Sequence, residues 1–130
     1  DTFEINGVDL NDYALNIAKE KLPIANFKIG SITDLPFENS SIDFVFTHKL
    51  LNYLDDDTLE KGVAEMYRVA GKYIMNCEIY DEIEKQIDEN HKFRNMGKRW
   101  GEYNVKMVSD VDMHEDIEPD KNRFTLLKKL

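Results

Sequence analysis

Three short apolar segments of this chain end in or lead into residues that could bind a ligand, at the ends of expected parallel strands. Asp9 ends the first such segment, Gly30 and Ser31 follow the second, and His48 follows the third. An acid at the carboxyl end of a parallel strand can accept hydrogen bonds from both hydroxyls of a ribose, and nucleotide-like ligands bind at these strand ends. The pattern therefore predicts a site for an adenosine-type ligand. The alternative is a solvated acid at a strand end that helps to cap the next helix.

The elements expected to position these residues alternate between strands and helices. Residues 3–10 are apolar at alternate positions and then continuously, which predicts a strand, and Asn11 or Asp12 can cap a helix that Pro23 ends. The acidic run 55–57 predicts the start of a second helix. Further strands are expected at residues 27–29, 42–47 and 72–77. Their nearly continuous apolar character is typical of inner strands, and the order predicts an α/β fold with a mostly parallel sheet.

The last third of the chain has a different pattern. The acidic segment 81–90 is expected to be helical, because Ile83 and Ile87 lie four residues apart. Residues 105–111 and 123–130 form two strand-like segments with a turn signal between them. Strands joined this closely must be antiparallel, because a parallel return needs a long crossover. We therefore expect an antiparallel hairpin at the end of the chain.

Composition narrows the classes of partner. The 130 residues are 42% apolar and 33% charged, which is typical of one globular domain. A net charge of -9 argues against nucleic acid, and no apolar stretch reaches membrane-spanning length. Cys77 is the single cysteine, which suits a reducing cytoplasm, and the three histidines share no metal-ligand spacing. A small molecule is the expected partner, with no metal.

Several motifs together resemble the central part of class I S-adenosylmethionine-dependent methyltransferases. The sequence G-V-D-L-N at residues 7–11 is similar to that family's second strand and its ribose-binding acid. The sequence L-P-F at residues 35–37, followed by I-D-F-V at residues 42–45, resembles the run that enters the fourth strand. L-L-N-Y-L at residues 50–54 corresponds to a segment beside the transferring methyl group. The resemblance extends to about residue 80.

The resemblance implies a fold, a cosubstrate and a reaction. The expected fold is a Rossmann-like methyltransferase sheet, mostly parallel with a C-terminal antiparallel hairpin, in one partial domain of residues 1–130. The family's first strand and glycine-rich loop have no counterpart in this sequence, so we expect an N-terminally truncated domain. S-adenosylmethionine is the implied cosubstrate, and a small molecule is the implied methyl acceptor.

The resemblance also assigns cosubstrate contacts to individual residues. Asp9 is expected to bind the ribose and Leu10 to pack against the adenine. The loop that follows the third strand of the family lies along the adenine, and here it contains Ser31 where the broader family commonly has an aspartate. The expected cosubstrate-binding residues are Asp9, Leu10, Gly30, Ser31, Ile32 and Thr47.

Three residues are candidates for catalysis. His48 can remove a proton from a hydroxyl or amine acceptor, because an imidazole is a common general base at neutral pH. Tyr53 replaces a histidine that is common in the family, and Tyr80 lies with Glu78 at the end of the fifth strand of the family pattern. Each of these residues can instead be an exposed loop or strand-end residue. With or without a catalytic base, alignment of the two reactants supplies much of the rate of a methyl transfer.

A basic segment at residues 92–99 stands out in the acidic chain. Arg94 and Arg99 can bind an anionic acceptor such as a carboxylated or nucleotide-linked sugar. The alternative is that the segment pairs with the acidic residues before it. A narrower resemblance, to methylases associated with pseudaminic acid biosynthesis, rests on residues 30–32 and 72–80 and points to a sugar-derived acceptor.

Two other functions compete with methyl transfer. A non-catalytic Rossmann-like remnant is favoured by the missing glycine-rich loop and opposed by the presence of Asp9. A nicotinamide-dependent oxidoreductase would use the same strand-end acid. Short-chain members of that class carry a Y-x-x-x-K pair, and no tyrosine here is followed by a lysine four residues later.

Overall fold

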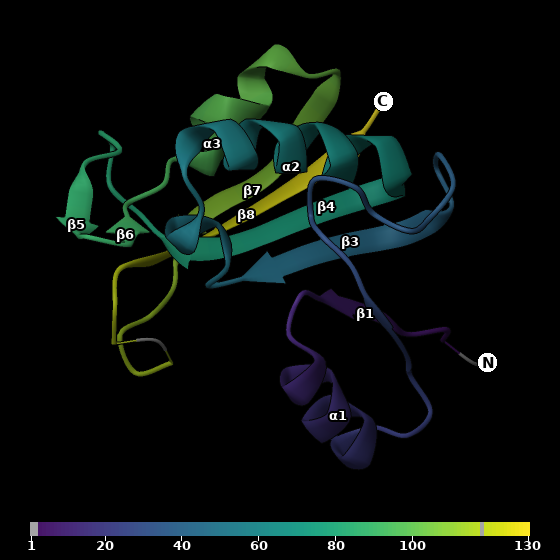
Figure 1. The fold of residues 1–130 in the computed structure, drawn as a ribbon. Helices are drawn as coiled ribbons and strands as arrows, with labels where there is room; N and C mark the ends of the chain where they lie inside the picture. Colours follow the sequence, from purple (N-terminus) through teal and green to yellow (C-terminus); the bar gives the residue numbers. More distant parts are fainter. Residues whose placement is uncertain (1–2, 118) are drawn as a thin grey trace.

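The first third of the chain forms a small unit of two strands and a helix (Figure 1). The computed structural model describes residues 3–117 and 119–130. Strand β1 (Asn6–Asp9) pairs in parallel with β2 (Asn26–Ile29), and α1 (Asp12–Lys21) connects them. Asn11 is the N-cap, as predicted, because its side chain accepts hydrogen bonds from the backbone N–H groups of Tyr13 and Ala14. Leu15 is buried, and the other described hydrophobic side chains of this unit are at least partly exposed.

The remainder of the chain is built on a four-stranded sheet in the order β3-β4-β8-β7. Strand β3 (Ile42–His48) is parallel to β4 (Ala70–Ile79), whereas β8 (Asn122–Lys129) is antiparallel to both β4 and β7 (Val105–Asp112). The antiparallel hairpin at the end of the chain is thus confirmed.

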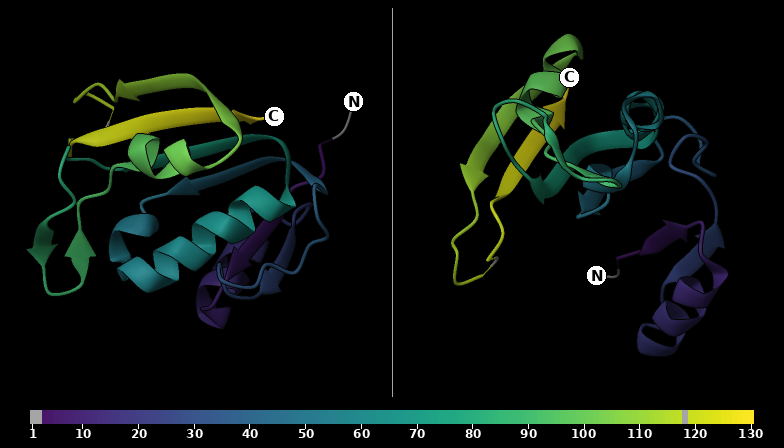
Figure 2. Two further views of the ribbon diagram at one scale, coloured as in Figure 1. Left: turned by 90° about the horizontal axis from the view of Figure 1, so that it is seen from above. Right: turned by 60° about the vertical axis from the view of Figure 1, so that its left-hand side comes forward.

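One face of this sheet is covered by helices, as both views of Figure 2 show. These are α2 (Asp56–Val69), the short α3 (Met96–Arg99), and the 3₁₀ turns η1 (Leu51–Tyr53) and η2 (Trp100–Glu102). Helix α2 begins at the predicted acidic run, where Asp55 accepts a hydrogen bond from the Thr58 N–H. The buried core between the helices and the sheet comprises Leu51, Leu59, Val63, Met66, Ala70, Ile74, Met96, Trp100 and Leu127.

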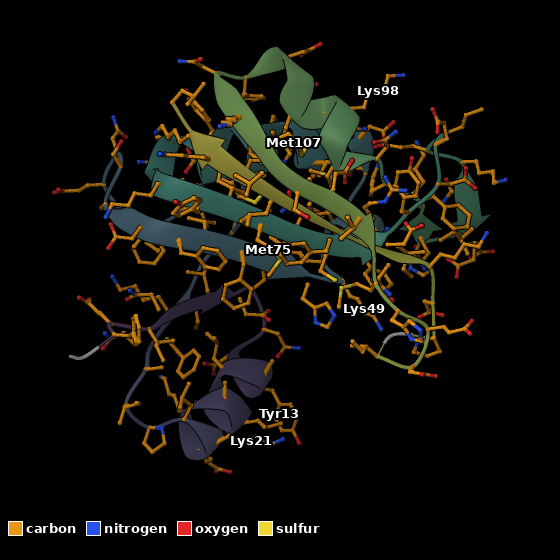
Figure 3. All side chains as sticks on the ribbon, turned by 180° about the vertical axis from the view of Figure 1, so that it is seen from behind. Tyr13, Lys21, Lys49, Met75, Lys98 and Met107 are labelled. Carbon is orange, nitrogen blue, oxygen red and sulfur yellow. The ribbon has the colours of Figure 1, made fainter. Side chains whose placement is uncertain are left out.

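The opposite face of the sheet carries no helix among the described residues. Figure 3 shows this face from behind, with Met75 on it. Strand β3 pairs with β4 alone and β2 with β1 alone in the described part of the chain, so both are edge strands. The prediction of an inner strand was wrong for β2 and β3 and is confirmed for β4. Phe44 is 46% exposed and Phe46 is 62% exposed. The sequence of β3 is thus as apolar as that of a strand buried on both faces, although two of its aromatic side chains are exposed.

The acidic segment after β4 is a second correction. Instead of a helix over residues 81–90, the chain forms turns and a small antiparallel hairpin of β5 (Gln86–Asp88) and β6 (His91–Lys92). Ile83 is 73% exposed and Ile87 is 39% exposed, so the apolar pair that suggested a helix face has no core to pack on. No helix in the described part of the chain is long and apolar enough to cross a membrane.

Candidate functional site

The ends of β1 and β2 bring the predicted ribose and adenine contacts together. The Gly30 N–H donates a hydrogen bond to the backbone carbonyl of Asp9 over 3.1 Å, so the two strand ends are adjacent. Asp9 is exposed, and its Oδ1 accepts a hydrogen bond from the Asn11 N–H at 2.9 Å. Leu10 is 73% exposed, so its side chain offers an apolar surface beside the carboxylate. Asp9 thus lies at the end of a strand, as predicted.

The loop after β2 is held in shape by its own side chains. Ser31 Oγ accepts a hydrogen bond from the Thr33 N–H at 3.1 Å and lies 2.7 Å from Thr33 Oγ1. Ile32 packs against α2 at Gly62, where a Cβ would lie 3.1 Å from the Ile32 side chain. A Cβ on Gly30 would likewise lie 3.0 Å from a methyl group of Val8. Both glycines therefore allow the loop to pack closely between β1 and α2.

A mainly apolar cavity of about 260 Å³ lies between β1 and β3. Residues of both strands and of the 32–37 loop line it, together with Leu50, Met66 and Val69. Thr47 and Ile32, both predicted cosubstrate contacts, are among the lining residues. Strands β1 and β3 run in the same direction in Figure 1, so their carboxyl ends lie on the same side of this cavity.

The three candidate catalytic residues have different surroundings. His48 ends β3 and is exposed. The Tyr53 ring stacks on His91 of the β5–β6 hairpin, with ring centroids 4.5 Å apart and planes 6° apart. The Arg123 guanidinium lies over the Tyr80 ring, with Arg123 Cζ 3.6 Å from the ring centroid. The structure therefore gives the rings of Tyr53 and Tyr80 packing partners. His48 is the candidate base on the ground of its place at the end of β3.

The basic segment is tied into the fold by ion pairs. The Arg94 side chain is fully buried, and its guanidinium donates to Asp56 at 2.8 Å, to Glu84 at 2.9 Å and to the carbonyls of Leu51 and Leu54. Arg99 binds Glu84 at 2.6 Å. Hydrogen bonds from Arg94 and then Lys92 lower the pKa of Asp56 to about 2. The alternative of internal pairing is thus observed, and Arg94 has no donor directed to solvent.

A buried acid that the sequence indicated only weakly lies beside the strand ends. Glu78 is 2% exposed near the end of β4, and it accepts hydrogen bonds from the N–H groups of Leu50 and Leu51. Burial raises its pKa to about 7 against the opposing effect of these bonds. An acid at a strand end gave a weak signal in the sequence, because its partners lie 27 and 28 residues away.

Comparison with known proteins places the chain in a family. A family model described as a methyltransferase domain matches residues 1–72, which is more than half of the 130 residues. The chain therefore belongs to this methyltransferase-domain family. A search of curated proteins finds no match.

Solved structures share the fold at low sequence identity. A SAM-dependent methyltransferase from Methanosarcina mazei has a TM-score of 0.78 and 14% identity, over 98% of this chain and 82% of its own. A SAM-dependent methyltransferase from Thermotoga maritima, described as a possible histamine N-methyltransferase, has a TM-score of 0.67 and 16% identity, over 99% and 84%. A Burkholderia thailandensis 1,6-didemethyltoxoflavin-N1-methyltransferase, with bound 1,6-didemethyltoxoflavin and S-adenosylhomocysteine, has a TM-score of 0.75 and 9% identity, over 97% and 61%.

These similarities establish a Rossmann-like methyltransferase fold. Together with the family match they support S-adenosylmethionine as the cosubstrate, as the sequence predicted. The family match, which is to a methyltransferase domain, favours the methyltransferase over the nicotinamide-dependent oxidoreductase.

Proposed function

We propose that the protein transfers a methyl group from S-adenosylmethionine to a small-molecule acceptor, with the cosubstrate at the carboxyl ends of β1, β2 and β3. The observation that carries the proposal is the pairing of the exposed Asp9 with the Gly30 loop, inside the segment that matches the methyltransferase family. The Asp9 carboxylate at the end of β1 can accept hydrogen bonds from a ribose, and the closely packed loop after β2 suits an adenine.

The residues of the chain have separate tasks in this proposal. The sulfonium of the cosubstrate supplies the methyl group. Asp9 accepts hydrogen bonds from the ribose hydroxyls, and Leu10 and the 30–32 loop flank the adenine. His48, exposed at the end of β3, accepts a proton when the acceptor is a hydroxyl or an amine. Holding the two reactants in line supplies much of the remaining rate.

We further propose that a parallel strand fills the space between β1 and β3 and brings the glycine-rich loop of the family to the cosubstrate. We call this space the strand slot. Three observations support it: each of the two strands pairs on one side alone in the described residues, a cavity of about 260 Å³ lies between them, and Phe44 and Phe46 are exposed on β3. A strand in the slot would pair with the open edges of both β1 and β3, whose backbone N–H and C=O groups a sheet neighbour can satisfy.

The acceptor we propose is a sugar-derived anion, as the narrower resemblance to the pseudaminic-acid methylases suggests. The support lies in the sequence at residues 30–32 and 72–80. The two arginines predicted to bind the acceptor differ in exposure. The Arg94 side chain is fully buried, whereas the Arg99 side chain is 26% exposed. Arg99 is therefore the more accessible arginine of this pair, although its guanidinium also binds Glu84.

Cosubstrate binding tests the proposal directly. With protein expressed from its complete reading frame, Asp9→Ala should weaken the affinity for S-adenosylhomocysteine by about tenfold or more, because a charge-assisted ribose contact is lost. Glu4→Ala is the matched control, because it removes an exposed acid before the other end of β1. Calorimetry is the measurement. Equal affinities of parent and Asp9→Ala remove Asp9 from the site, and a parent that binds nothing supports the non-catalytic alternative.

A further inference from the structure

The carboxylate of Glu78 is the centre of a buried hydrogen-bond network under the end of β3. Its Oε1 accepts hydrogen bonds from the backbone N–H groups of Leu50 at 2.8 Å and Leu51 at 2.5 Å. Its Oε2 accepts one from Thr47 Oγ1 at 3.3 Å. Glu78 thus joins the end of β4 to both sides of the turn that leaves β3.

The sheet core sets the direction of these bonds. The Trp100 indole N–H donates to Asn76 Oδ1 at 2.8 Å, which leaves the Asn76 amide group to donate to Thr47 Oγ1 at 2.7 Å. Thr47 already accepts that bond, so it offers its own hydrogen to Glu78. All the neighbours of the carboxylate in this network are therefore donors, as an ionised carboxylate requires.

Further bonds fix the same turn to β4. The Lys49 N–H donates to the Cys77 carbonyl at 2.9 Å, and Lys49 has a φ of 51°, in the left-handed region that non-glycine residues seldom adopt. The Asn52 side chain bonds both the N–H and the carbonyl of Ile79, each at 2.9 Å. The 47–52 loop is consequently held in a strained shape by bonds from β4.

This loop borders the proposed cosubstrate site. Thr47 and Leu50 line the cavity between β1 and β3, and His48 lies between them at the end of the strand. A buried carboxyl group costs folding free energy unless its hydrogen bonds offset its desolvation. The burial that raises the Glu78 pKa to about 7 shows that this cost is incompletely offset. Stability alone gives no reason for an acid at this position.

We propose that Glu78 is a positioning residue, whose carboxylate holds the 47–52 loop in the shape that receives the cosubstrate. This inference rests on the proposed function. Replacement by alanine leaves the N–H groups of Leu50 and Leu51 without their side-chain acceptor, so the loop relaxes. Glutamine keeps a side-chain oxygen for those two groups, and its amide can donate to Thr47 once the Thr47 hydroxyl turns its second lone pair toward it.

Two measurements on protein expressed from its complete reading frame test the inference. The first is amide hydrogen exchange at Leu50 and Leu51, and the second is the calorimetric affinity for S-adenosylhomocysteine. Glu78→Ala should speed exchange by about tenfold or more and weaken the affinity by about tenfold or more. Glu78→Gln should keep both within about threefold of the parent.

Thr125→Val is the control for a purely structural loss. Thr125 is 1% exposed on β8, and its hydroxyl donates to Asp110 of β7 at 2.9 Å, on the side of β8 that is opposite to β4. This variant should lose stability without changing either measurement. Faster exchange in Glu78→Ala with unchanged affinity overturns the positioning role and leaves the proposed function intact. A parent protein that does not bind S-adenosylhomocysteine overturns both the positioning role and the proposed function. If Glu78→Ala does not fold, Glu78→Gln decides the question. A tenfold loss of affinity in Glu78→Gln, with the Leu50 and Leu51 amides still protected, then overturns the positioning role.

Discussion

The carboxyl group of Glu78 should make the stability of the protein depend on pH near neutrality. Burial raises its pKa from 4.5 to about 7, so the folded chain holds this proton more tightly than the unfolded chain. The stabilising contribution is complete below about pH 4.5 and is lost as the pH rises to about 7, with a size of roughly 3 kcal/mol. Urea unfolding at pH 5 and pH 8 should therefore show this loss in the parent. It should be absent from the same comparison in Glu78→Gln, and an identical loss in both proteins would contradict the assignment.

Asp9 and Glu78 differ in how much of their role could be predicted from sequence. The position of Asp9 follows from local signals, an apolar strand followed by a helix cap at Asn11, and the structure places it as expected. The buried Glu78 is satisfied by the N–H groups of Leu50 and Leu51. The buried Arg94 is satisfied by the carboxylates of Glu84 and Asp56. These contacts depend on how separate elements pack, and local propensity carries no information about them.

At the level of elements, the strands and the two longer helices were predictable because their apolar residues repeat with the period of each structure. Helix α2 and strands β4, β7 and β8 lie where expected. The segment 81–90 was not predictable in this way, since its two isoleucines match a helix period without a surface to bury them. Its conformation follows from Glu84, which binds Arg94 and Arg99 and fixes the turn before the β5–β6 hairpin.

Arg94 should be a structural link between these elements. Its buried guanidinium joins η1, the start of α2 and the turn at Glu84, so Arg94→Ala leaves Asp56 and Glu84 short of a partner. We expect a loss of roughly 3 kcal/mol in the free energy of unfolding. Arg99→Ala should lose about 1 kcal/mol, because Arg99 is partly exposed and Glu84 keeps Arg94. Urea titrations compare the two variants, and equal small losses would show that the buried link is dispensable.

For the whole molecule, the exposed edge at β3 predicts association. Phe46 is 62% exposed on an edge strand, and such a strand pairs readily with another chain. In the chain of 130 residues, Phe46→Lys should weaken self-association by about tenfold or more, because a lysine on an edge opposes pairing. Sedimentation velocity measures this.

Ile83→Lys is the control for this edge, since Ile83 is 73% exposed in the turn before β5. If both lysine variants behave alike, exposed apolar area in general drives the association. In a protein whose own strand fills the strand slot, the parent and Phe46→Lys should self-associate equally weakly.

The sparse burial of the β1–α1–β2 unit has a thermodynamic consequence. With Leu15 as its buried hydrophobic residue among those described, this unit gains little from its own core, and a ligand reaching from Asp9 to Thr47 would connect it to the larger sheet. Differential scanning calorimetry should then show a small early heat-absorption peak for the unit and a later main peak. Saturating S-adenosylhomocysteine should merge the two peaks, because binding free energy adds to the stability of the unit that melts first. Cosubstrate occupancy would thus govern whether the molecule melts as two bodies or as one.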